Sequence, residues 1–170
     1  MTAVNLLILE SEAEYREEYA RVFLDSPFFL SSEIQVVFSR EDFDHIFFEP
    51  SGRFGPSGEK LRSFSFRRAR RMLFMNAILS GNLNIEMLFE CDTGNLAVFC
   101  DDLECVMYLR NRMGSNCLQV GTFFDFGKDH TKMCNKQKKK CEPITLREVK
   151  QRYGITPKGE KAVILGPTTF

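Results

Sequence analysis

Four short strand-like segments follow one another between residues 85 and 126, and they constrain the fold more than any other feature. They are "IEMLFEC" (85–91), "LAVFC" (96–100), "LECVMYLR" (103–110) and "CLQVGTFFDF" (117–126). The connections between them hold two to six residues and are rich in Asp, Asn and Gly. Connections this short favour antiparallel neighbours. We therefore expect a four-stranded antiparallel meander.

The segment before the meander, residues 66–80, has the apolar spacing of a helix and is followed by Gly81. Met72, Met75 and Leu79 form a row at helical spacing, which predicts the face that packs on the sheet. Arg68 falls on the same row. A helix on one face of an antiparallel meander is an α+β fold.

The flanking segments are predicted from capping and breaker residues. Ser11 with Glu14 and Thr145 with Glu148 are capping boxes for an N-terminal helix and for a helix that ends at Gly154. The other expected elements are strands at 4–9, 33–38 and 162–165, a helical turn capped by Ser39 within 39–50, a loop at 51–60, and a basic helix or ordered loop that Pro143 ends. We expect one domain over 1–170, with a core at 43–126 and a basic C-terminal extension at 127–170.

Targeting and cofactor signals are missing from the sequence. No apolar run approaches the roughly 20 residues of a membrane span. The opening "MTAVNLLILESEAEYREEY" lacks the apolar stretch of a signal peptide. The six cysteines contain no CxxC pair, and no zinc spacing is present. We expect a cytoplasmic protein with reduced thiols, no metal and no cofactor.

Charge is strongly segregated along the chain although the net charge is zero. Residues 1–50 hold 3 basic and 11 acidic side chains, and residues 82–110 hold 1 and 6. Residues 51–81 hold 7 basic and 1 acidic side chain, and residues 111–170 hold 12 and 5. The balance argues against a non-specific DNA coat but allows a local site for anions.

Four arginines crowd the start of the predicted helix at 66–80, where the helix dipole disfavours cations. Arg67, Arg70 and Arg71 share a stripe, which is either a solvated face paired with acids or a contact for phosphate. Arg68, at the edge of the apolar row, needs a partner because an unpaired buried charge is costly. That partner is either an internal acid such as Glu90 or Asp92, or an external anion held beside the helix N-cap Ser65.

The two histidines are the first candidates for proton transfer. His45 lies among Asp42, Asp44 and Glu49, which favour its protonated form. His130 lies between Lys128 and Lys132, which have the opposite effect. Each is equally well an ordinary surface or core histidine.

Two strands supply hydroxyl groups. Alternation on 103–110 puts Cys105, Met107 and Leu109 on the core face, and Tyr108 and Arg110 on a half-polar face, which is a candidate lining for a cleft. On 117–126, alternation puts Leu118, Val120, Thr122 and Phe124 on one face. Gly121 in mid-strand indicates a bulge or the close approach of another backbone. Lys138, Lys139 and Lys140 are further candidates for phosphate contact, or a solvated run.

The segments "HIFFEP" and "RRARRMLFMNAIL", followed by four antiparallel strands, resemble the barnase–EndoU–colicin–RelE-like nuclease superfold, in particular its phage-associated branch. The similarity covers roughly residues 43 to 126. Its marks here are a strand that bears His45, the pair Arg68-Ala69 near the helix start, and Thr122-Phe123 in the last strand. The resemblance implies metal-independent cleavage of RNA by attack of the 2′-hydroxyl on phosphorus. The superfold also includes members that have lost nuclease activity.

The sequence thus predicts a small ribonuclease-like enzyme, encoded by a phage or prophage. His45, Arg68, Tyr108, Thr122 and His130 are its candidate catalytic residues. Phosphate or nucleic-acid contacts are expected from Ser65, Arg67, Arg70, Arg71 and the lysine run. The alternatives are a non-enzymatic protein that binds a host protein or nucleic acid through its arginines, and an enzyme that acts on DNA.

Overall fold

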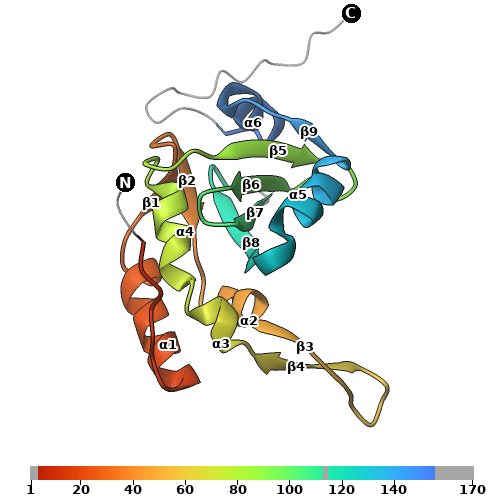
Figure 1. The fold of residues 1–170 in the computed structure, drawn as a ribbon. Helices are drawn as coiled ribbons and strands as arrows, with labels where there is room; N and C mark the ends of the chain where they lie inside the picture. Colours follow the sequence, from red (N-terminus) through yellow and green to blue (C-terminus); the bar gives the residue numbers. More distant parts are fainter. Residues whose placement is uncertain (1–3, 113–114, 156–170) are drawn as a thin grey trace, which may run out of the picture.

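A seven-stranded sheet forms the centre of the molecule in a computed structural model, which describes residues 4–112 and 115–155 (Figure 1). Its strands are β1 (Phe28–Leu30), β2 (Ile34–Val37), β5 (Glu86–Glu90), β6 (Leu96–Cys100), β7 (Cys105–Asn111), β8 (Leu118–Asp125) and β9 (Cys141–Pro143). A separate hairpin pairs β3 (Phe48–Phe54) with β4 (Lys60–Phe64). The helices are α1 (Glu12–Tyr19), α2 (Asp42–Phe47), α3 (Phe66–Ala69), α4 (Met72–Leu79), α5 (His130–Lys138) and α6 (Leu146–Arg152), with a π-helical turn η1 (Ala20–Leu24) and a 3-10 turn η2 (Gly127–Asp129).

The predicted α+β class is confirmed, but the prediction of a sheet with only four strands is wrong. The strands β5, β6, β7 and β8 are consecutive antiparallel neighbours, as expected. The sheet continues beyond them in the order β1-β2-β8-β7-β6-β5-β9. The added strands come from outside residues 43–126, and β2 runs parallel to β8, with Val36 opposite Leu118. The strand predicted at 33–38 is confirmed as β2, but its pairing with β8, far along the chain, leaves little local signal.

The predicted helix at 66–80 is interrupted, so that prediction is wrong in its middle. α3 is a single turn, capped by Ser65, whose hydroxyl accepts a hydrogen bond from the Arg68 backbone N–H at 3.4 Å. The chain leaves the helix at Arg71, which has φ −96° and ψ 11°. Arg71 Nη1 donates to the Arg67 carbonyl at 2.8 Å, where a continuous helix would use only backbone donors. The four arginines therefore surround a break between two helices.

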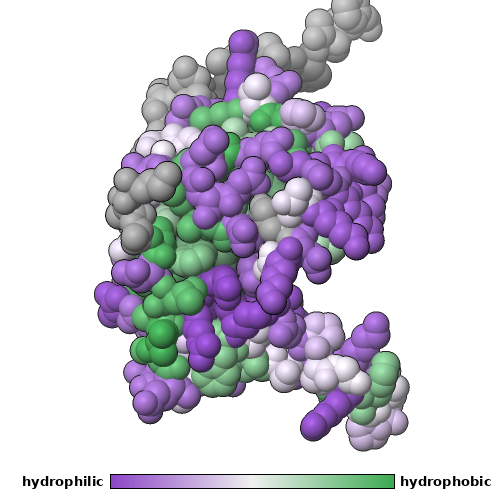
Figure 2. Space-filling view, viewed as in Figure 1, coloured by the Kyte–Doolittle hydropathy of each residue, from purple (hydrophilic) through white to green (hydrophobic). Residues whose placement is uncertain are grey.

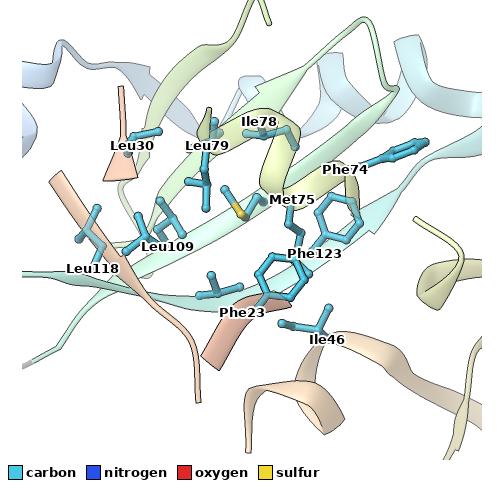
Figure 3. Packing of buried hydrophobic residues seen from close by; sticks show 14 of the residues in the cluster. Phe23, Leu30, Ile46, Phe74, Met75, Ile78, Leu79, Leu109, Leu118 and Phe123 are labelled. Atoms are coloured by element: carbon cyan, nitrogen blue, oxygen red, sulfur yellow. The ribbon is translucent and has the colours of Figure 1, made fainter. Parts of the chain in front are cut away.

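α4 covers one face of the sheet, as its apolar spacing predicts. Met72, Met75 and Ile78 are fully buried. They pack against the core side of the meander, where Met107 and Leu109 of β7 and Leu118 of β8 lie. Figure 3 shows Met75, Ile78 and Leu79 pointing into this cluster together with Phe123 and Phe23.

α5 lies against the opposite face of the sheet. Cys134 packs there with Val106 and Tyr108 of β7 and with Phe99 of β6. The two faces of β7 therefore divide its side chains as the alternation predicts. α5 covers only part of this face (Figure 1), and the rest carries the site described below.

The N-terminal half is held together by aromatic rings and departs from prediction in three places. The predicted loop at 51–60 is correct only for residues 55–59, because residues 51–54 and 60 belong to hairpin β3–β4, in which Phe54 pairs with Lys60. His45 lies in helix α2 and not on a strand. Residues 4–9 form no strand, and the Leu7 N–H donates to the Arg70 carbonyl at 2.8 Å.

Both predicted capping boxes are confirmed, at Ser11 with Glu14 and at Thr145 with Glu148. Ser39 lies one turn before α2, where its backbone N–H donates to Asp42 Oδ2 at 2.7 Å, and its hydroxyl does not cap the helix. The predicted strand at 162–165 lies outside the described residues. Within residues 4–112 and 115–155 no helix is long and apolar enough to cross a membrane.

Candidate functional site

A hollow of about 470 Å³ opens on the part of the sheet face that α5 leaves uncovered. We call it the sheet-face hollow. Its lining comes from β5, β7, β8 and α5, together with Asn95 in the turn before β6. It includes Glu90, Tyr108, Arg110, Thr122, Phe124 and Gln137. A carboxylate, two hydroxyls, a guanidinium and an aromatic ring therefore share one concave surface.

Gly121 determines which side chains of β8 enter the sheet-face hollow. The register shifts between Tyr108 and Leu109, which pair with Thr122 and Val120, so Gly121 is the extra residue of a bulge. The bulge predicted at this glycine is confirmed. Beyond it the alternation is inverted. Thr122 and Phe124 line the hollow, whereas Phe123 joins the core under α4, so the prediction that Thr122 shares a face with Leu118 is wrong.

Tyr108 presents a neutral hydroxyl to the hollow. Burial raises the pKa of Tyr108, and the negative charge of Glu90 raises it further. Its ring stacks on Phe124, with centroids 5.9 Å apart and planes inclined at 24°. Among the described residues, no side chain or backbone group forms a hydrogen bond with the Tyr108 hydroxyl.

Arg110 is held at the edge of the hollow by a buried carboxylate. Asp42 on α2 is 1% exposed, and its Oδ1 lies 3.7 Å from Arg110 Nη2. Gln119 Nε2 also donates to the two Asp42 oxygens at 3.0 and 3.2 Å. The Arg110 side chain remains 48% exposed, so its guanidinium can contact both Asp42 and a ligand.

The arginines at α3 have carboxylate partners within the protein. Arg67 Nη1 lies 2.6 Å from Asp125 Oδ1, and Arg71 Nη2 lies 3.7 Å from Asp125 Oδ2. Arg68 Nε lies 3.1 Å from Glu49 Oε2. Of the two partners considered for Arg68, the internal acid is present, but it is Glu49 and neither Glu90 nor Asp92. The Ser65 hydroxyl is buried and used as a cap.

These pairs leave a surplus of positive charge. Three guanidinium groups, those of Arg67, Arg68 and Arg71, share the two carboxylates of Glu49 and Asp125. Arg62, which donates to the His45 carbonyl, adds a fourth positive charge nearby, so the cations exceed the acids by two. Burial lowers the pKa of Arg68, and the nearby Arg67 and Arg62 lower it further against the pull of Glu49. Arg68 Nε is buried and forms no hydrogen bond, because Glu49 is close but not aligned with its N–H. The cluster is compensated only in part.

Arg68 connects this cluster to the sheet-face hollow. Its guanidinium carbon lies 5.6 Å from the centroid of Phe124, which lines the hollow. Its Nη1 donates to the Ile46 carbonyl at the end of α2, at 3.3 Å. His45, one residue earlier, has an exposed side chain and does not line the hollow.

The remaining predicted residues lie farther along the chain. His130 is the first residue of α5, and its side chain lies outside the described part of the structure. Lys138 pairs with Glu86 and covers the ring of Phe99 at 5.4 Å. Lys139 and Lys140 are exposed just after α5, and Arg70 is exposed between α3 and α4.

The structure thus brings together Tyr108 and Thr122 among the predicted catalytic residues, with Arg68 at the margin. Sequence reasoning assigned no ligand role to Glu90, Gln137 or Asp42. Alternation on β7 had already placed Arg110 beside Tyr108, so that signal was present. Within the described ranges, no three His, Cys, Asp or Glu side chains form a group that could hold a metal ion.

No protein-family model matches the chain, and comparisons with curated proteins and with solved structures likewise found no match. The site is therefore interpreted from its own chemistry.

Proposed function

We propose that the protein is a ribonuclease-like enzyme that binds single-stranded RNA in the sheet-face hollow and cleaves it without a metal. The observation that carries the proposal is the hollow itself, where Glu90, Tyr108, Thr122 and Arg110 meet on an open sheet face. Aromatic rings on a sheet face stack bases, and a guanidinium pairs with phosphate. The resemblance of residues 43–126 to the nuclease superfold supports the same class of substrate.

Each residue has a role in the proposed reaction. Glu90 removes the proton of the 2′-hydroxyl, whose oxygen then attacks phosphorus and displaces the 5′-oxygen of the next nucleotide. Arg110 stabilises the charge on the phosphoryl oxygens. The neutral Tyr108 hydroxyl is the donor for the leaving oxygen, and Thr122 donates to a phosphoryl oxygen. The products are a 2′,3′-cyclic phosphate and a free 5′-hydroxyl.

His45 is the competing candidate for the proton transfer, with Arg68 and Arg62 as the cations beside it. α2 carries His45, and the main-chain carbonyls of His45 and Ile46 accept hydrogen bonds from Arg62 and Arg68. Glu90→Gln and His45→Gln discriminate between the two assignments. Loss of a general base lowers the rate by about a hundredfold or more. We expect that loss for Glu90→Gln, and an unchanged rate for His45→Gln.

The experiment incubates the purified full chain with an unstructured RNA oligonucleotide in the presence of EDTA. We expect cleavage products that carry cyclic phosphate ends. A strand of the same sequence with 2′-deoxyribose throughout is the matched control and should remain intact, because it lacks the attacking oxygen. Glu17→Gln, an exposed substitution on α1, controls for charge. RNA that stays intact with and without added divalent metals contradicts the proposal, and cleavage of the deoxy strand indicates a DNA-processing enzyme.

A second candidate function is binding without cleavage, as in a phage or prophage protein that engages a host protein or nucleic acid. The observation that favours it is the internal pairing of Arg67, Arg68 and Arg71, which removes part of the charge expected at a phosphate site. In this case RNA remains whole, and replacing Arg67, Arg70 and Arg71 together by Gln weakens binding more than Glu90→Gln does.

A further inference from the structure

The distal part of hairpin β3–β4, residues 50–62, extends away from the rest of the molecule; we call it the arm (Figures 1 and 2). Its two strands pair with each other and form a sheet of their own. Phe54 is 65% exposed and Leu61 is 40% exposed. Core packing among the described residues therefore does not explain the presence of Phe54 and Leu61 in this segment.

The base of the arm is fixed firmly to the body. The rings of Phe48 and Phe64 lie 5.8 Å apart across the two strands, and Phe64 stacks on Phe43 of α2 at 6.0 Å. The Ser65 N–H donates to the Phe47 carbonyl at 2.8 Å. A hairpin anchored in this way presents its exposed side chains in a fixed direction, which lowers the entropic cost of binding.

The register of the arm places one aromatic ring and two cations on the same face. Phe54 is directly opposite Lys60, and Arg62 is two residues farther along β4. Directly opposite residues, and residues two apart on one strand, share a face of a sheet. Leu61, between Lys60 and Arg62, points to the other face, and Arg53 lies in the irregular stretch of β3 between Pro50 and Phe54. Figure 2 shows hydrophobic and hydrophilic side chains mixed along this hairpin.

Charge continues from the arm to the sheet-face hollow. The arm holds three cations and one acid, so its net charge is +2, and Glu59 is occupied by the backbone N–H of Ser57 at 3.0 Å. Burial is the largest cause that lowers the pKa of Arg68, and the nearby positive charges of Arg67 and Arg62 lower it further. Arg68 in turn lies over Phe124 in the hollow. A row of cations therefore leads from the arm to the hollow.

We propose that the arm binds the part of a single RNA strand that extends beyond the hollow, with a base stacked on Phe54 and phosphates paired with Lys60 and Arg62. The inference rests on the proposed function and deepens it, because it requires a substrate several nucleotides long. A ring and cations on one face match the alternation of base and phosphate along a single strand. An acidic polypeptide is the competing ligand for the arm. It would contact the cations of the arm alone, so it does not explain why the row of cations continues to the hollow.

The test measures binding of 2′-O-methyl oligoribonucleotides, which lack the attacking hydroxyl, to the full chain. One probe is a trinucleotide, and the other has about fifteen nucleotides, the length that a stacking groove covers. We expect Phe54→Ser to weaken binding of the long probe by about tenfold, the effect of one lost base stack. Binding of the trinucleotide, which the hollow alone accommodates, should be unchanged.

The matched controls are Leu61→Ser, on the opposite face, and Arg53→Gln, outside the regular register. Lys60→Gln and Arg53→Gln remove the same charge from the arm. We expect Lys60→Gln to reduce the slope of log affinity against log salt by about 0.7 for the long probe. Arg53→Gln should change that slope less, and Leu61→Ser should leave affinity unchanged. Thermal unfolding of each variant checks that its fold is retained.

The outcomes separate this inference from the proposed function. If the long probe binds no more tightly than the trinucleotide and Phe54→Ser changes neither, the arm proposal is overturned while the hollow remains a binding site. If neither probe binds the wild type, the proposed function fails as well. If Phe54→Ser and Lys60→Gln weaken binding of polyglutamate but not of RNA, the arm binds acidic polypeptide. Equal effects of Lys60→Gln and Arg53→Gln also overturn the face-specific contact.

Discussion

Two buried aspartates organise the charged side chains around the site. Asp42 connects α2 to Gln119 and Arg110, and Asp125 at the end of β8 connects the sheet to Arg67 and Arg71. A buried carboxylate is stable only when cations and donors compensate it. The arginine-rich segment therefore has a structural role at Asp125 whatever its role toward ligands.

Asp125→Asn tests this structural role. The substitution keeps the shape of the side chain but removes the charge that Arg67 and Arg71 share. Breaking a buried pair costs about 3–5 kcal/mol, and we expect about 1–3 kcal/mol here because Arg67 is half exposed. Urea denaturation gives the free energy of unfolding. Glu12→Gln, which breaks the exposed pair with Arg16, should change it by less than about 1 kcal/mol.

The partner of Arg68 illustrates the limit of sequence reasoning at this scale. The position of Arg68 on an apolar row correctly indicated that it needs compensation. The identity of Glu49 as the partner was not predictable, because Glu49 is positioned by hairpin β3–β4. The Gly, Ser and Pro content of residues 51–60 had indicated a loop there instead. Thr122 and Phe124 were likewise assigned by simple alternation, which fails beyond a bulge.

At the scale of elements, the bulge in β8 is the feature that builds the hollow. Regular pairing would put Thr122 and Phe124 under α4, and Phe123 and Asp125 on the other face. One additional residue at Gly121 inverts this arrangement. The glycine is not required for a left-handed conformation, and a Cβ placed there would meet the Tyr108 carbonyl oxygen at 3.5 Å, an ordinary contact.

Deletion and substitution at Gly121 should therefore differ sharply. Deleting Gly121 restores regular alternation, which moves Phe123 out of the core and Asp125 away from its arginines. We expect a loss of more than about 3 kcal/mol of folding free energy. Gly121→Ala should cost less than about 1 kcal/mol. Thermal and urea unfolding compare the two, and similar losses would show that the inserted residue does not set the register.

The capping box of α6 gives a pH-dependent contribution to stability. Hydrogen bonds from the Thr145 backbone N–H and hydroxyl lower the pKa of Glu148 below its ordinary value of 4.5. A carboxyl group whose pKa is lower in the folded than in the unfolded protein stabilises the fold at pH values above its unfolded-state pKa. This stabilisation is lost as the pH falls through the folded-state pKa. Glu148→Gln keeps the box but cannot titrate. Its unfolding free energy should fall less than that of the wild type between about pH 5 and pH 3, and equal decreases would contradict this.

How well each element could be predicted depends on how far apart in the sequence its interacting residues lie. The meander strands and both capped helices were predicted because turns and caps are local signals. β2 was predicted as a strand at 33–38, but its pairing with β8 and that of β9 with β5 join segments distant in sequence, and the short β1 pairs with β2. The break between α3 and α4 follows from side-chain contacts across the fold. These features depend on tertiary structure, which overrides local propensity.

At the scale of the whole molecule, phenylalanine joins the N-terminal elements into one unit. The chain has 17 phenylalanines and no tryptophan. Rings from α1, η1, α2, the hairpin and the start of α3 contact one another in succession, and Phe43 touches Tyr19, Phe47 and Phe64. The hairpin and α2 therefore keep their positions beside the sheet through ring packing.

Phe43→Ala tests whether this ring cluster stabilises the whole molecule. Phe43 is 1% exposed, and truncating a buried phenylalanine costs about 3–5 kcal/mol. We expect that loss in urea denaturation, together with faster hydrogen exchange in α2 and the hairpin. Phe54→Ala is the control, because the exposed ring should change stability by less than about 0.5 kcal/mol. Fast exchange confined to α2 would show that the cluster is only local.

The parallel pairing of β2 with β8 also governs how the chain is made. Val36 can pair with Leu118 only after the 82 positions up to Leu118 have been synthesised. At a translation rate of about 5–20 residues per second, β2 spends several seconds on the ribosome paired with β1 on one edge and without a partner on the other. Chaperones that shield nascent chains would act in this interval, which ends only when β8 leaves the exit tunnel.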